Sequence, residues 1–550
     1  MANPIDTRRE QAFPKLTAAQ IARLRSHGQC IRTERGQVLV EPGDREVRFF
    51  VVLSGCLEIL RPGLGGEELV VVHQAGQFSG EITTLQGLPS LIRSRVRESG
   101  EVLALEHESL RAVIQSDSEL SEIFMRAFIL RRVGLIAQQQ GDVILLGSRH
   151  SGGTLRLQQF LSRNSFPYVY LDVDTDQSVQ ALIERFHIVV SDVPVVLCRG
   201  QVLKNPSNEQ VAQCLGMNPA IDDCAVHDLV VIGAGPAGLA AAVYAASEGL
   251  DVLVVESNAP GGQAGSSSKI ENYLGFPTGI SGQALAGRAF VQAQKFGANV
   301  AIANSAIRLR CEQKPYIIQL STDHSVRART LIVASGAAYR QLAVEHFDRF
   351  LGVGVYYAAT FVEAQLCQRD DVIVVGGGNS AGQAAVFLSQ ASRHVHVLVR
   401  SDGLADSMSR YLIRRIEESP NITLHTHTEI VGLHGETSLE KVTWRNGSGI
   451  AETREIRHVF LMMGADPNTG WLQGCLALDE KGFVRTGMDI TAQELQDRAW
   501  PLTRPPHHLE TNLPGIFAVG DVRSGSVKRV AAAVGEGSAC VQLVHRALHE

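Results

Sequence analysis

The stretch that decides the fold is "DLVVIGAGPAGLAAAVYAASEGLDVLVVES", residues 228–257. An apolar strand leads into a Gly-x-Gly-x-x-Gly loop at Gly233, Gly235 and Gly238, and a helix and a second apolar strand follow. In such a loop the first glycine allows a tight turn, the second lets the main chain approach a pyrophosphate, and the third lets helix and strand pack closely. Glu256 ends the second strand, where an acid takes the ribose hydroxyls. The segment therefore predicts a dinucleotide-binding Rossmann unit.

A second unit of the same kind is "VIVVGGGNSAGQAAVFLSQASRHVHVLVRS", residues 372–401. Its loop has the Gly-x-Gly-x-x-Ala form, and Arg400 stands where the first unit has its acid. A cation there disfavours the bare ribose of NAD and can pair with a 2′-phosphate, so NADPH is expected rather than NADH. The alternative is a solvated surface arginine. The predicted NADPH contacts are Gly376, Gly378, Asn379, Ser380, Ala381 and Arg400.

The composition sets the class of protein. At 550 residues the chain is too long for one core, and about three or four domains are expected. Hydrophobic residues make up 45% and charged residues 20%, as in ordinary globular proteins. The net charge of −6 offers no basic surface for nucleic acid. Because there is no signal sequence and no run of eighteen apolar residues, we expect a cytoplasmic protein without membrane insertion.

The nine cysteines are scattered, without a Cys-x-x-Cys pair or zinc-ligand spacing. This pattern is typical of reduced, mostly structural thiols. The stretch "WPLTRPPHHLETNLP" (500–514) is interpreted as a surface loop. His507 and His508 within it are an alternative metal pair, but the sequence offers no partner ligands, so no metal site is predicted.

Two dinucleotide sites in tandem, the second inserted into the first domain, are the plan of flavoprotein reductases that carry hydride from a nicotinamide to FAD. Residues 228–548 resemble the low-molecular-weight thioredoxin reductase family nearly end to end, through "GGQAGSSSKIENYLGFP" (261–277), "ASGA" (334–337) and "GIFAVGDV" (515–522). "KRVAAAVGEG" (528–537) opens a helix whose first amides would face the flavin. The resemblance implies FAD and NADPH as cofactors and a homodimer. The FAD contacts predicted from the glycine loop and the resemblance are Gly233, Gly235, Pro236, Ala237, Gly238, Glu256, Gly262, Gln263, Asn272, Ala334, Gly336, Gly520, Asp521, Arg529, Val530 and Ala531.

The redox dithiol of that family is missing. By the resemblance it belongs in "GVYYAATFVEAQ" (354–365), where Ala358 and Phe361 occupy the two cysteine positions. Neither side chain can form a thiolate, so disulfide exchange at that site is excluded. We therefore expect an FAD-dependent NADPH oxidoreductase with another acceptor, such as a quinone, an electron-transfer protein, a small molecule or oxygen. Tyr356, Tyr357 and Phe361 would form an apolar wall for this acceptor, or belong to the core.

Two alternatives stay open. A disulfide reductase could use a pair of remote cysteines, which replacement of the cysteines would test. A regulatory protein could use the flavin and nucleotide sites to sense the redox state with little turnover. Steady NADPH consumption with an acceptor would favour an enzyme, whereas stoichiometric binding without turnover would favour a sensor.

Residues 34–110 read as short strands broken by glycine turns, which predicts a β-roll, and an apolar helix follows. Nearly the whole segment resembles the cyclic-nucleotide-binding domain family. The resemblance implies that Glu81, after Gly80, accepts a ribose hydroxyl and that Arg93 and Ser94 hold the cyclic phosphate. This pair stands about one residue away from the usual alignment, so a β-roll with an empty or altered pocket is an equal alternative. If the protein is an enzyme, its N-terminal modules would tune domain rotation or acceptor access.

Residues 141–217 give the order β-α-β-α-β-β-α, which resembles the thioredoxin and glutaredoxin fold. Pro194 stands where that family carries a cis-proline. The loop "GSRHSGGT" (147–154) should carry the dithiol and contains no cysteine. The segment is interpreted as a thioredoxin-like shell kept for docking, with chemistry at His150 or Ser151 as the alternative.

The predicted fold class is multidomain: an N-terminal β-roll with helices, a thioredoxin-like α/β domain, and two Rossmann-like three-layer domains for FAD and NADPH. The predicted boundaries are 1–140 for the β-roll, 141–220 for the thioredoxin-like domain, 225–342 and 467–550 for the two parts of the FAD domain, and 343–466 for the NADPH domain.

Overall fold

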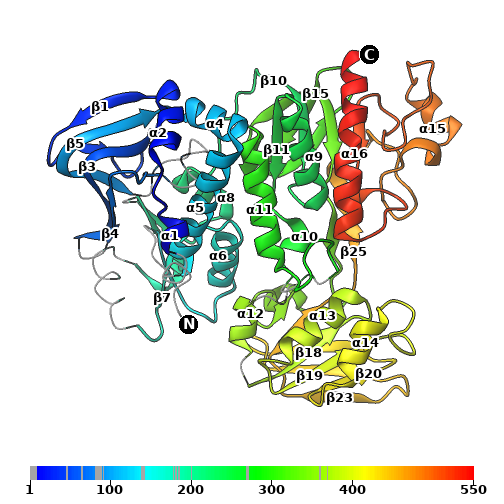
Figure 1. Cartoon of the computed structure of the whole chain (residues 1–550). Coiled ribbons are helices and arrows are strands. Elements are labelled where there is room, and N and C mark those ends of the chain that lie inside the picture. Colours follow the sequence, from blue (N-terminus) through cyan, green and yellow to red (C-terminus); the bar gives the residue numbers. More distant parts are fainter. Residues whose placement is uncertain are drawn as a thin grey trace. The chain divides into compact units, whose positions relative to one another are not determined.

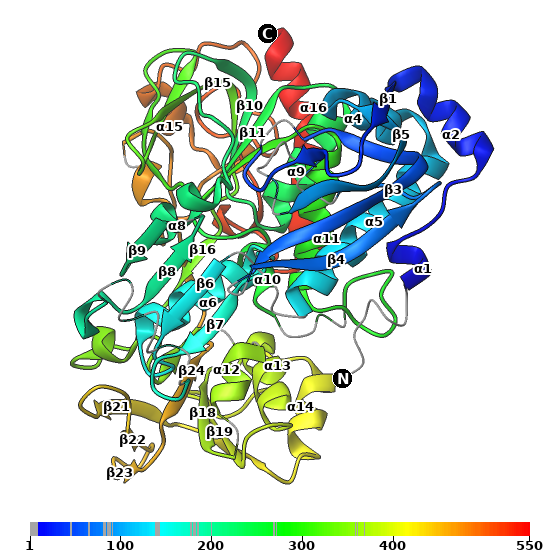
Figure 2. The same cartoon turned by 90° about the vertical axis from the view of Figure 1, so that its left-hand side faces the viewer.

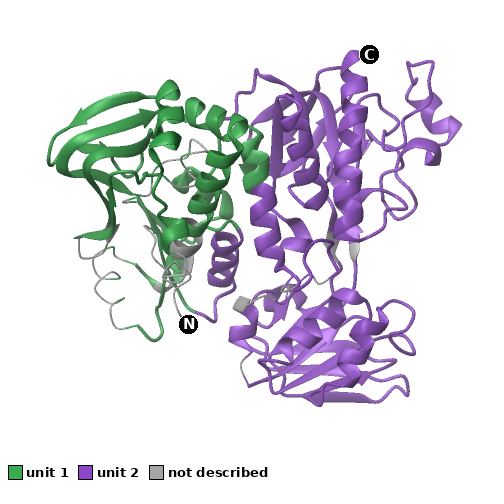
Figure 3. Ribbon diagram, viewed as in Figure 1, with its two compact units in different colours: residues 1–148, 164–220, 291–303 green, residues 149–163, 221–290, 304–550 purple. Residues whose placement is uncertain are grey.

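The computed structural model of the chain contains two compact units (Figures 1 and 3). The first comprises residues 1–148, 164–220 and 291–303, and the second comprises residues 149–163, 221–290 and 304–550. The residues that the structure describes are 9–44, 47–63, 66–80, 84, 90, 92–137, 143–176, 179, 183, 186, 188–199, 201–267, 270, 272–357, 359, 361–367, 369–472 and 474–550.

The first unit begins with the predicted β-roll. Its elements are α1 Arg9–Ala12, α2 Ala18–Leu24, β1 Gln29–Thr33, β2 Val38–Val40, β3 Phe49–Gly63, β4 Gly66–Gln74, β5 Arg93–Leu105, α4 His107–Ser116 and α5 Ser118–Ala137. The sheet has the order β1-β5-β3-β4, and β2 pairs with β5. Phe49, Phe78, Phe124 and Phe128 form one aromatic cluster, with ring centroids 4.9 to 6.4 Å apart. Burial of these rings fixes α5 against the sheet.

A second sheet in the first unit has the order β7-β6-β8-β9. Its strands are β6 Val143–Gly147, β7 Val169–Asp172, β8 Val195–Cys198 and β9 Gln201–Lys204, and α8 Asn208–Leu215 follows. These elements keep the order predicted for the thioredoxin-like segment, and the Val193–Pro194 peptide bond is cis. Most of the second predicted helix lies outside the described residues. The first, α6 (Gly152–Arg163), groups with the second unit.

The second unit contains the predicted FAD-type sheet, which has seven strands in the order β12-β11-β10-β15-β14-β13, with β26 paired to β15. Strands β10, β11, β15 and β26 run parallel, so their carboxyl ends lie at one edge, where the first glycine loop begins. Helices α9 and α16 pack against each other beside this sheet (Figure 1). The elements are β10 Val226–Ile232, α9 Pro236–Ser247, β11 Val252–Glu256, α10 Gly262–Gly265, α11 Gly282–Lys295, β12 Asn299–Ile302, β13 Ala306–Arg310, β14 Tyr316–Leu320, β15 Ser325–Val333, α15 Ala492–Asp497, β26 Ile516–Ala518 and α16 Val530–His549.

The NADPH-type domain is built on a parallel sheet in the order β17-β24-β18-β19-β20. One side is covered by α13 and α14 and the other by the small sheet β21-β22-β23 (Figure 2). The two-stranded ribbon β16-β25 lies where the chain enters and leaves this domain. The elements are β16 Ala337–Tyr339, β17 Val355–Tyr356, α12 Phe361–Leu366, β18 Asp371–Val375, α13 Asn379–Leu388, β19 His394–Leu398, α14 Arg410–Glu417, β20 Ile422–His425, β21 Glu429–His434, β22 Lys441–Arg445, β23 Ala451–Arg454, β24 His458–Leu461 and β25 Ala465–Pro467.

Stability of the NADPH-type domain should depend on pH through His396. Its Nδ1 lies 3.1 Å from His425 Nε2, and burial, helped by His394 and His425, lowers the pKa of His396 to about 4. Between pH 6.5 and 4 the unfolded chain therefore binds more protons than the folded one, and the stability present above pH 6.5 is lost as pH falls. We expect about 3 kcal/mol of lost unfolding free energy across that window. Urea unfolding at a series of pH values should show this slope in the wild type and a flatter one in His396→Phe. Equal slopes would contradict the assignment.

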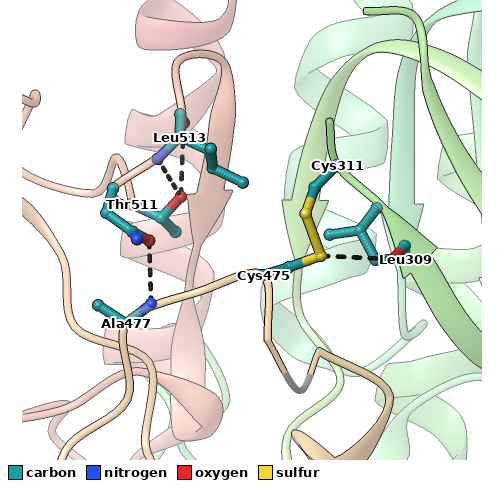
Figure 4. The surroundings of a disulfide bond; sticks show 7 residues. Leu309, Cys311, Cys475, Ala477, Thr511 and Leu513 are labelled. Carbon is teal, nitrogen blue, oxygen red and sulfur yellow. Dashed lines mark hydrogen bonds between the residues drawn. A yellow bond between two sulfur atoms is a disulfide. The ribbon is translucent and has the colours of Figure 1, made fainter. Parts of the chain in front are cut away.

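The prediction of reduced cysteines is wrong for two pairs, because Cys198–Cys214 and Cys311–Cys475 are disulfides. Figure 4 shows the second pair. Cys198 ends β8 and Cys214 lies on α8, whereas Cys311 follows β13 and its partner is 164 residues further along the chain. The spacing of the cysteines in the sequence does not reveal either pair, because it is the folding of the sheets that brings the sulfurs together. The other five cysteines are free.

The stretch 500–514 is only partly the surface loop that was predicted. Leu509 to Asn512 are buried, and the Glu510 carboxylate is fully enclosed. Glu510 accepts hydrogen bonds from the Arg504 guanidinium (2.7 Å) and from the backbone amides of His507 and Gly515 (both 2.9 Å). A buried carboxylate that satisfies these donors anchors the loop, which a Pro- and His-rich sequence does not reveal.

Candidate active site

One cavity of about 1420 Å³ in the second unit joins the two glycine loops. It extends from the carboxyl edge of the FAD-type sheet to that of the NADPH-type sheet. The predicted FAD residues that line it are Gly233, Gly235, Pro236, Ala237, Glu256, Gly262, Gln263, Asn272, Ala334, Gly336, Gly520, Asp521, Arg529 and Val530, and the predicted NADPH residues are Gly376, Gly378, Asn379, Ser380 and Arg400. Gly238, Ala381 and Ala531 do not line it.

The first glycine loop has the geometry that its sequence predicts. Gly233 has φ +104°, and a Cβ there would lie 2.3 Å from the carbonyl oxygen of Ala334. A Cβ on Gly238 would lie 1.9 Å from the carbonyl oxygen of Gly233. Gly235 differs, because a Cβ there would meet nothing nearer than the Gly262 Cα at 4.0 Å. The open face of Gly235 leaves room for a phosphate beside the start of α9.

Glu256 is buried at the end of β11 and lines the cavity. Its Oε2 accepts a hydrogen bond from the Ala234 amide (2.7 Å), and its Oε1 accepts from the amides of Asn258 (2.9 Å) and Ala259 (3.2 Å). Two carboxylate oxygens have about four acceptor sites, so one remains for a ribose hydroxyl. The same bonds hold the ends of the glycine loop and of the loop after β11 together.

Glu536, which sequence reasoning missed, positions the second FAD-type motif. Its Oε2 accepts a hydrogen bond from the Gly520 amide (2.7 Å), and its Oε1 accepts from the Arg523 guanidinium (2.5 Å). Burial raises the pKa of the neighbouring Asp521, while Lys528 opposes that rise. A glutamate inside a helix belongs to no motif, and only the packing of α16 beside the Gly520 turn gives it this role.

The helix α16 presents its N-terminus to the cavity. Arg529 is the N-cap residue, with φ −142°, and both Arg529 and Val530 line the cavity. Lys528, also in the lining, donates a hydrogen bond to the carbonyl of Asp521 (3.2 Å). Unpaired amides and two cations make this end of the cavity favourable for an anion. Ala531, the second residue of α16, is exposed but does not line the cavity.

The second glycine loop repeats this construction. Gly376 has φ +138°, and a Cβ there would lie 2.2 Å from the carbonyl oxygen of Met462. Gly378 is open, with the nearest atom at 4.0 Å from a Cβ built there, and Ala381, in the first turn of α13, is fully buried. Arg400, just beyond β19, is exposed and lines the cavity as Glu256 does in the first unit. A cation is thus available where the second ribose would lie.

The stretch expected to carry a dithiol lies at this cavity. Ala358 is outside the described residues, and Phe361 begins α12. Tyr357 and Ala359 line the cavity, whereas Tyr356 is buried in the core of the NADPH-type domain. Tyr356 is therefore core rather than part of a wall for an acceptor. Cys367 is also fully buried, and burial raises the pKa of its thiol, as fits a structural cysteine.

The structure describes three of the four residues predicted to bind a cyclic nucleotide. Glu81 lies outside the described residues, and Gly80 has φ +97°. Arg93 forms ion pairs with Glu41 (2.7 Å) and Glu67. Ser94 is fully buried, and its Oγ has no hydrogen-bond partner among the described residues. A phosphate would have to compete with two carboxylates for Arg93.

The structure gives little support for chemistry at Ser151, which belongs to the alternative site in the thioredoxin-like segment. Ser151 Oγ accepts a hydrogen bond from the Thr154 amide (3.5 Å), so the serine caps α6.

No group of three metal-ligating side chains occurs in the described part of the chain, which includes His507 and His508. No helix among the described residues is long and apolar enough to span a membrane.

Comparison with known proteins identifies two segments of the chain. Residues 227–537 match the model of the family described as pyridine nucleotide-disulphide oxidoreductase, and residues 30–117 match the cyclic nucleotide-binding domain. The chain is 32% identical to a thioredoxin reductase from Mycolicibacterium smegmatis over 316 residues, which are 57% of this chain and 94% of the relative. It is 30% identical over 320 residues to the "34.2 kDa protein in rubredoxin operon" of Clostridium pasteurianum, covering 58% and 96%.

Solved structures give the same result. The thioredoxin reductase of Lactococcus lactis in its FR conformation aligns with a TM-score of 0.53 and 26% identity, over 59% of this chain and 99% of that one. The thioredoxin reductase of T. acidophilum aligns with a TM-score of 0.51 and 26% identity, over 58% and 98%. The chain therefore belongs to the pyridine nucleotide-disulphide oxidoreductase family, has the thioredoxin reductase-like fold, and carries an N-terminal cyclic nucleotide-binding domain.

Proposed function

We propose that the protein transfers electrons from NADPH, through FAD, to an acceptor that it reduces without a Cys-x-x-Cys dithiol. The observation that carries this proposal is the single cavity lined by both glycine loops. Its residues fit the two cofactors: Gly235 and Gly378 leave open faces for phosphates, Glu256 has acceptor capacity for a ribose, and Arg400 supplies a cation. Bound FAD would supply the capacity to accept a hydride and release electrons.

The chain's own residues would orient the cofactors in this scheme. The two loops would hold the phosphates at the N-termini of α9 and α13. The N-terminus of α16, with Lys528 and Arg529, would stabilise negative charge on a reduced flavin. Tyr357 and Ala359, which line the same cavity, would meet an acceptor in place of a dithiol.

The acceptor is a small molecule or a protein. One relative's name places it in a rubredoxin operon, so rubredoxin-like electron carriers belong among the acceptors to be assayed. We further propose that the cyclic nucleotide-binding domain modulates turnover when it binds a cyclic nucleotide. The homodimeric state and the cytoplasmic location stay predictions.

A disulfide reductase that uses remote cysteines is the second candidate, because two disulfides occur in the structure. Burial argues against both as redox centres: Cys198, Cys311 and Cys475 are each at most 7% exposed. An attacking thiolate needs access to a sulfur, so these pairs suit a structural role better.

The proposal predicts that anaerobic NADPH bleaches the flavin of the purified protein and that a quinone or ferricyanide restores its colour. Turnover with such acceptors should persist after Cys198→Ser and Cys311→Ser, because no thiol takes part. Stoichiometric NADPH binding without bleaching would instead support a sensor. Loss of turnover in either cysteine variant, with flavin content unchanged, would favour the remote-disulfide candidate.

A further inference from the structure

Helix α6 lies outside both segments that match known families, yet its last residue lines the candidate active site. Arg163 is part of the cavity wall, and its Nη2 donates a hydrogen bond to the Gly262 carbonyl (2.8 Å). The family matches cover residues 30–117 and 227–537 only. A cation that the reductase domain itself does not encode is therefore present beside its flavin-type loop. Helix α6, which carries it, belongs to the second unit (Figures 1 and 3).

The contacts of α6 fix this placement from both dinucleotide-binding domains. Gln283 of α11 donates a hydrogen bond to the Ser162 carbonyl (2.6 Å) on the FAD side. Gln159 donates to the fully buried Glu363 carboxylate of α12 on the NADPH side. Leu155 is buried in the core cluster of the NADPH-type domain. The helix is thus held at both ends, and Arg163 is not a freely moving surface side chain.

The neighbours of Arg163 indicate what it would bind. Gly262, whose carbonyl it contacts, lies against Gly235, the open glycine of the first loop: a Cβ on Gly262 would be 3.1 Å from the Gly235 Cα. Arg163 Nε is buried and has no hydrogen-bond partner among the described residues, and none of them forms an ion pair with this guanidinium. A guanidinium with spare donors beside a glycine that leaves room for a phosphate suits a phosphate oxygen.

We infer that Arg163 binds the pyrophosphate of FAD, so that the thioredoxin-like segment completes the flavin site. The inference rests on the proposed function, which requires FAD in this cavity. Gly235 brings main-chain amides to the phosphates, and Arg163 supplies the full positive charge that these amides lack. Helix α6, which neither family match covers, thereby contributes to flavin retention.

The test compares FAD and riboflavin binding to the full-length apoprotein, since riboflavin has no phosphate. Arg163→Gln should raise the Kd for FAD about 10- to 100-fold, the loss expected for a charge-assisted hydrogen bond, and leave the Kd for riboflavin unchanged. The Kd of Arg163→Lys for FAD should lie between those of the wild type and Arg163→Gln, because lysine keeps the positive charge but lacks the paired donors of a guanidinium. The affinity of the wild type should fall more steeply with salt than that of Arg163→Gln. Arg288→Gln, outside the cavity lining, is the charge-matched control.

The inference would be overturned by an FAD affinity of Arg163→Gln equal to that of the control. Equal weakening of FAD and riboflavin binding would also overturn it, because Arg163 would then only support Gly262. A raised KM for NADPH with unchanged FAD affinity would also overturn it, because the arginine would then serve the other dinucleotide. If the wild type itself fails to bind FAD or to be bleached by NADPH, the proposed function falls as well.

Discussion

Replacing Gly537 with alanine is expected to destabilise the FAD-type domain by about 3 kcal/mol and to abolish retention of FAD. A Cβ at this position of α16 would lie 2.1 Å from the Ala237 carbonyl oxygen and 2.9 Å from its carbon, both in the backbone of α9. To accept the methyl group, α16 must move away from the start of α9. That start carries the first glycine loop, and α16 holds the Gly520 turn through Glu536, so both parts of the flavin site would shift.

Gly535 is the matched control, because it lies on the same helix and a Cβ there meets no atom within 4 Å. Gly535→Ala should raise the free energy of unfolding by about 0.5 to 1 kcal/mol, as expected for a helix interior, and should keep its flavin. Urea unfolding and the ratio of flavin to protein absorbance measure both effects. If Gly537→Ala keeps FAD as well as Gly535→Ala does, the close packing of α16 on α9 is not required by the site.

Replacing Arg400 with glutamate is expected to lower kcat/KM for NADPH by about 100-fold and to reverse the preference towards NADH. The change removes the cation at the end of β19 and gives the second unit the acid that Glu256 gives the first. A carboxylate repels a 2′-phosphate but accepts hydrogen bonds from a bare ribose. The effect should appear in KM rather than in the rate of flavin reduction at saturation, because Arg400 contacts no reacting atom.

The control for this charge reversal is Arg410→Glu, since Arg410 is an exposed arginine of α14 outside the cavity lining. Stopped-flow reduction with NADPH and NADH gives both constants for each variant. An unchanged ratio of the two kcat/KM values in Arg400→Glu would show that Arg400 is only a solvated surface residue. An equal loss in Arg410→Glu would point to a general electrostatic effect.

Local sequence predicted the parts of the site that depend on local geometry. Gly233 and Gly238 could be identified because a positive φ or a contact between helix and strand requires glycine at fixed offsets from a strand. The β-roll and both Rossmann-like domains could be predicted from strand length and glycine turns, because these too are local features of the sequence.

Features that depend on tertiary packing could not be predicted. The disulfide Cys311–Cys475 joins cysteines 164 residues apart, and Glu536 gains its role only where α16 meets the Gly520 turn. The placement of Arg163 in the cavity wall depends on α6 grouping with the second unit, whereas the sequence of α6 shows only the first helix of a thioredoxin-like segment. Such long-range contacts leave no spacing signal in a single chain.

We expect flavin to be the redox centre that turns over, and this expectation fixes the number of electrons that each flavin takes up. Anaerobic titration of the purified protein with NADPH, followed by absorbance, should reach its end point at two electrons per FAD. The count should be the same in Cys198→Ser and Cys311→Ser, because the disulfides are structural. An end point of four electrons in the wild type that falls to two in one of these variants would instead show that a disulfide takes part in turnover and that flavin is not the only redox centre.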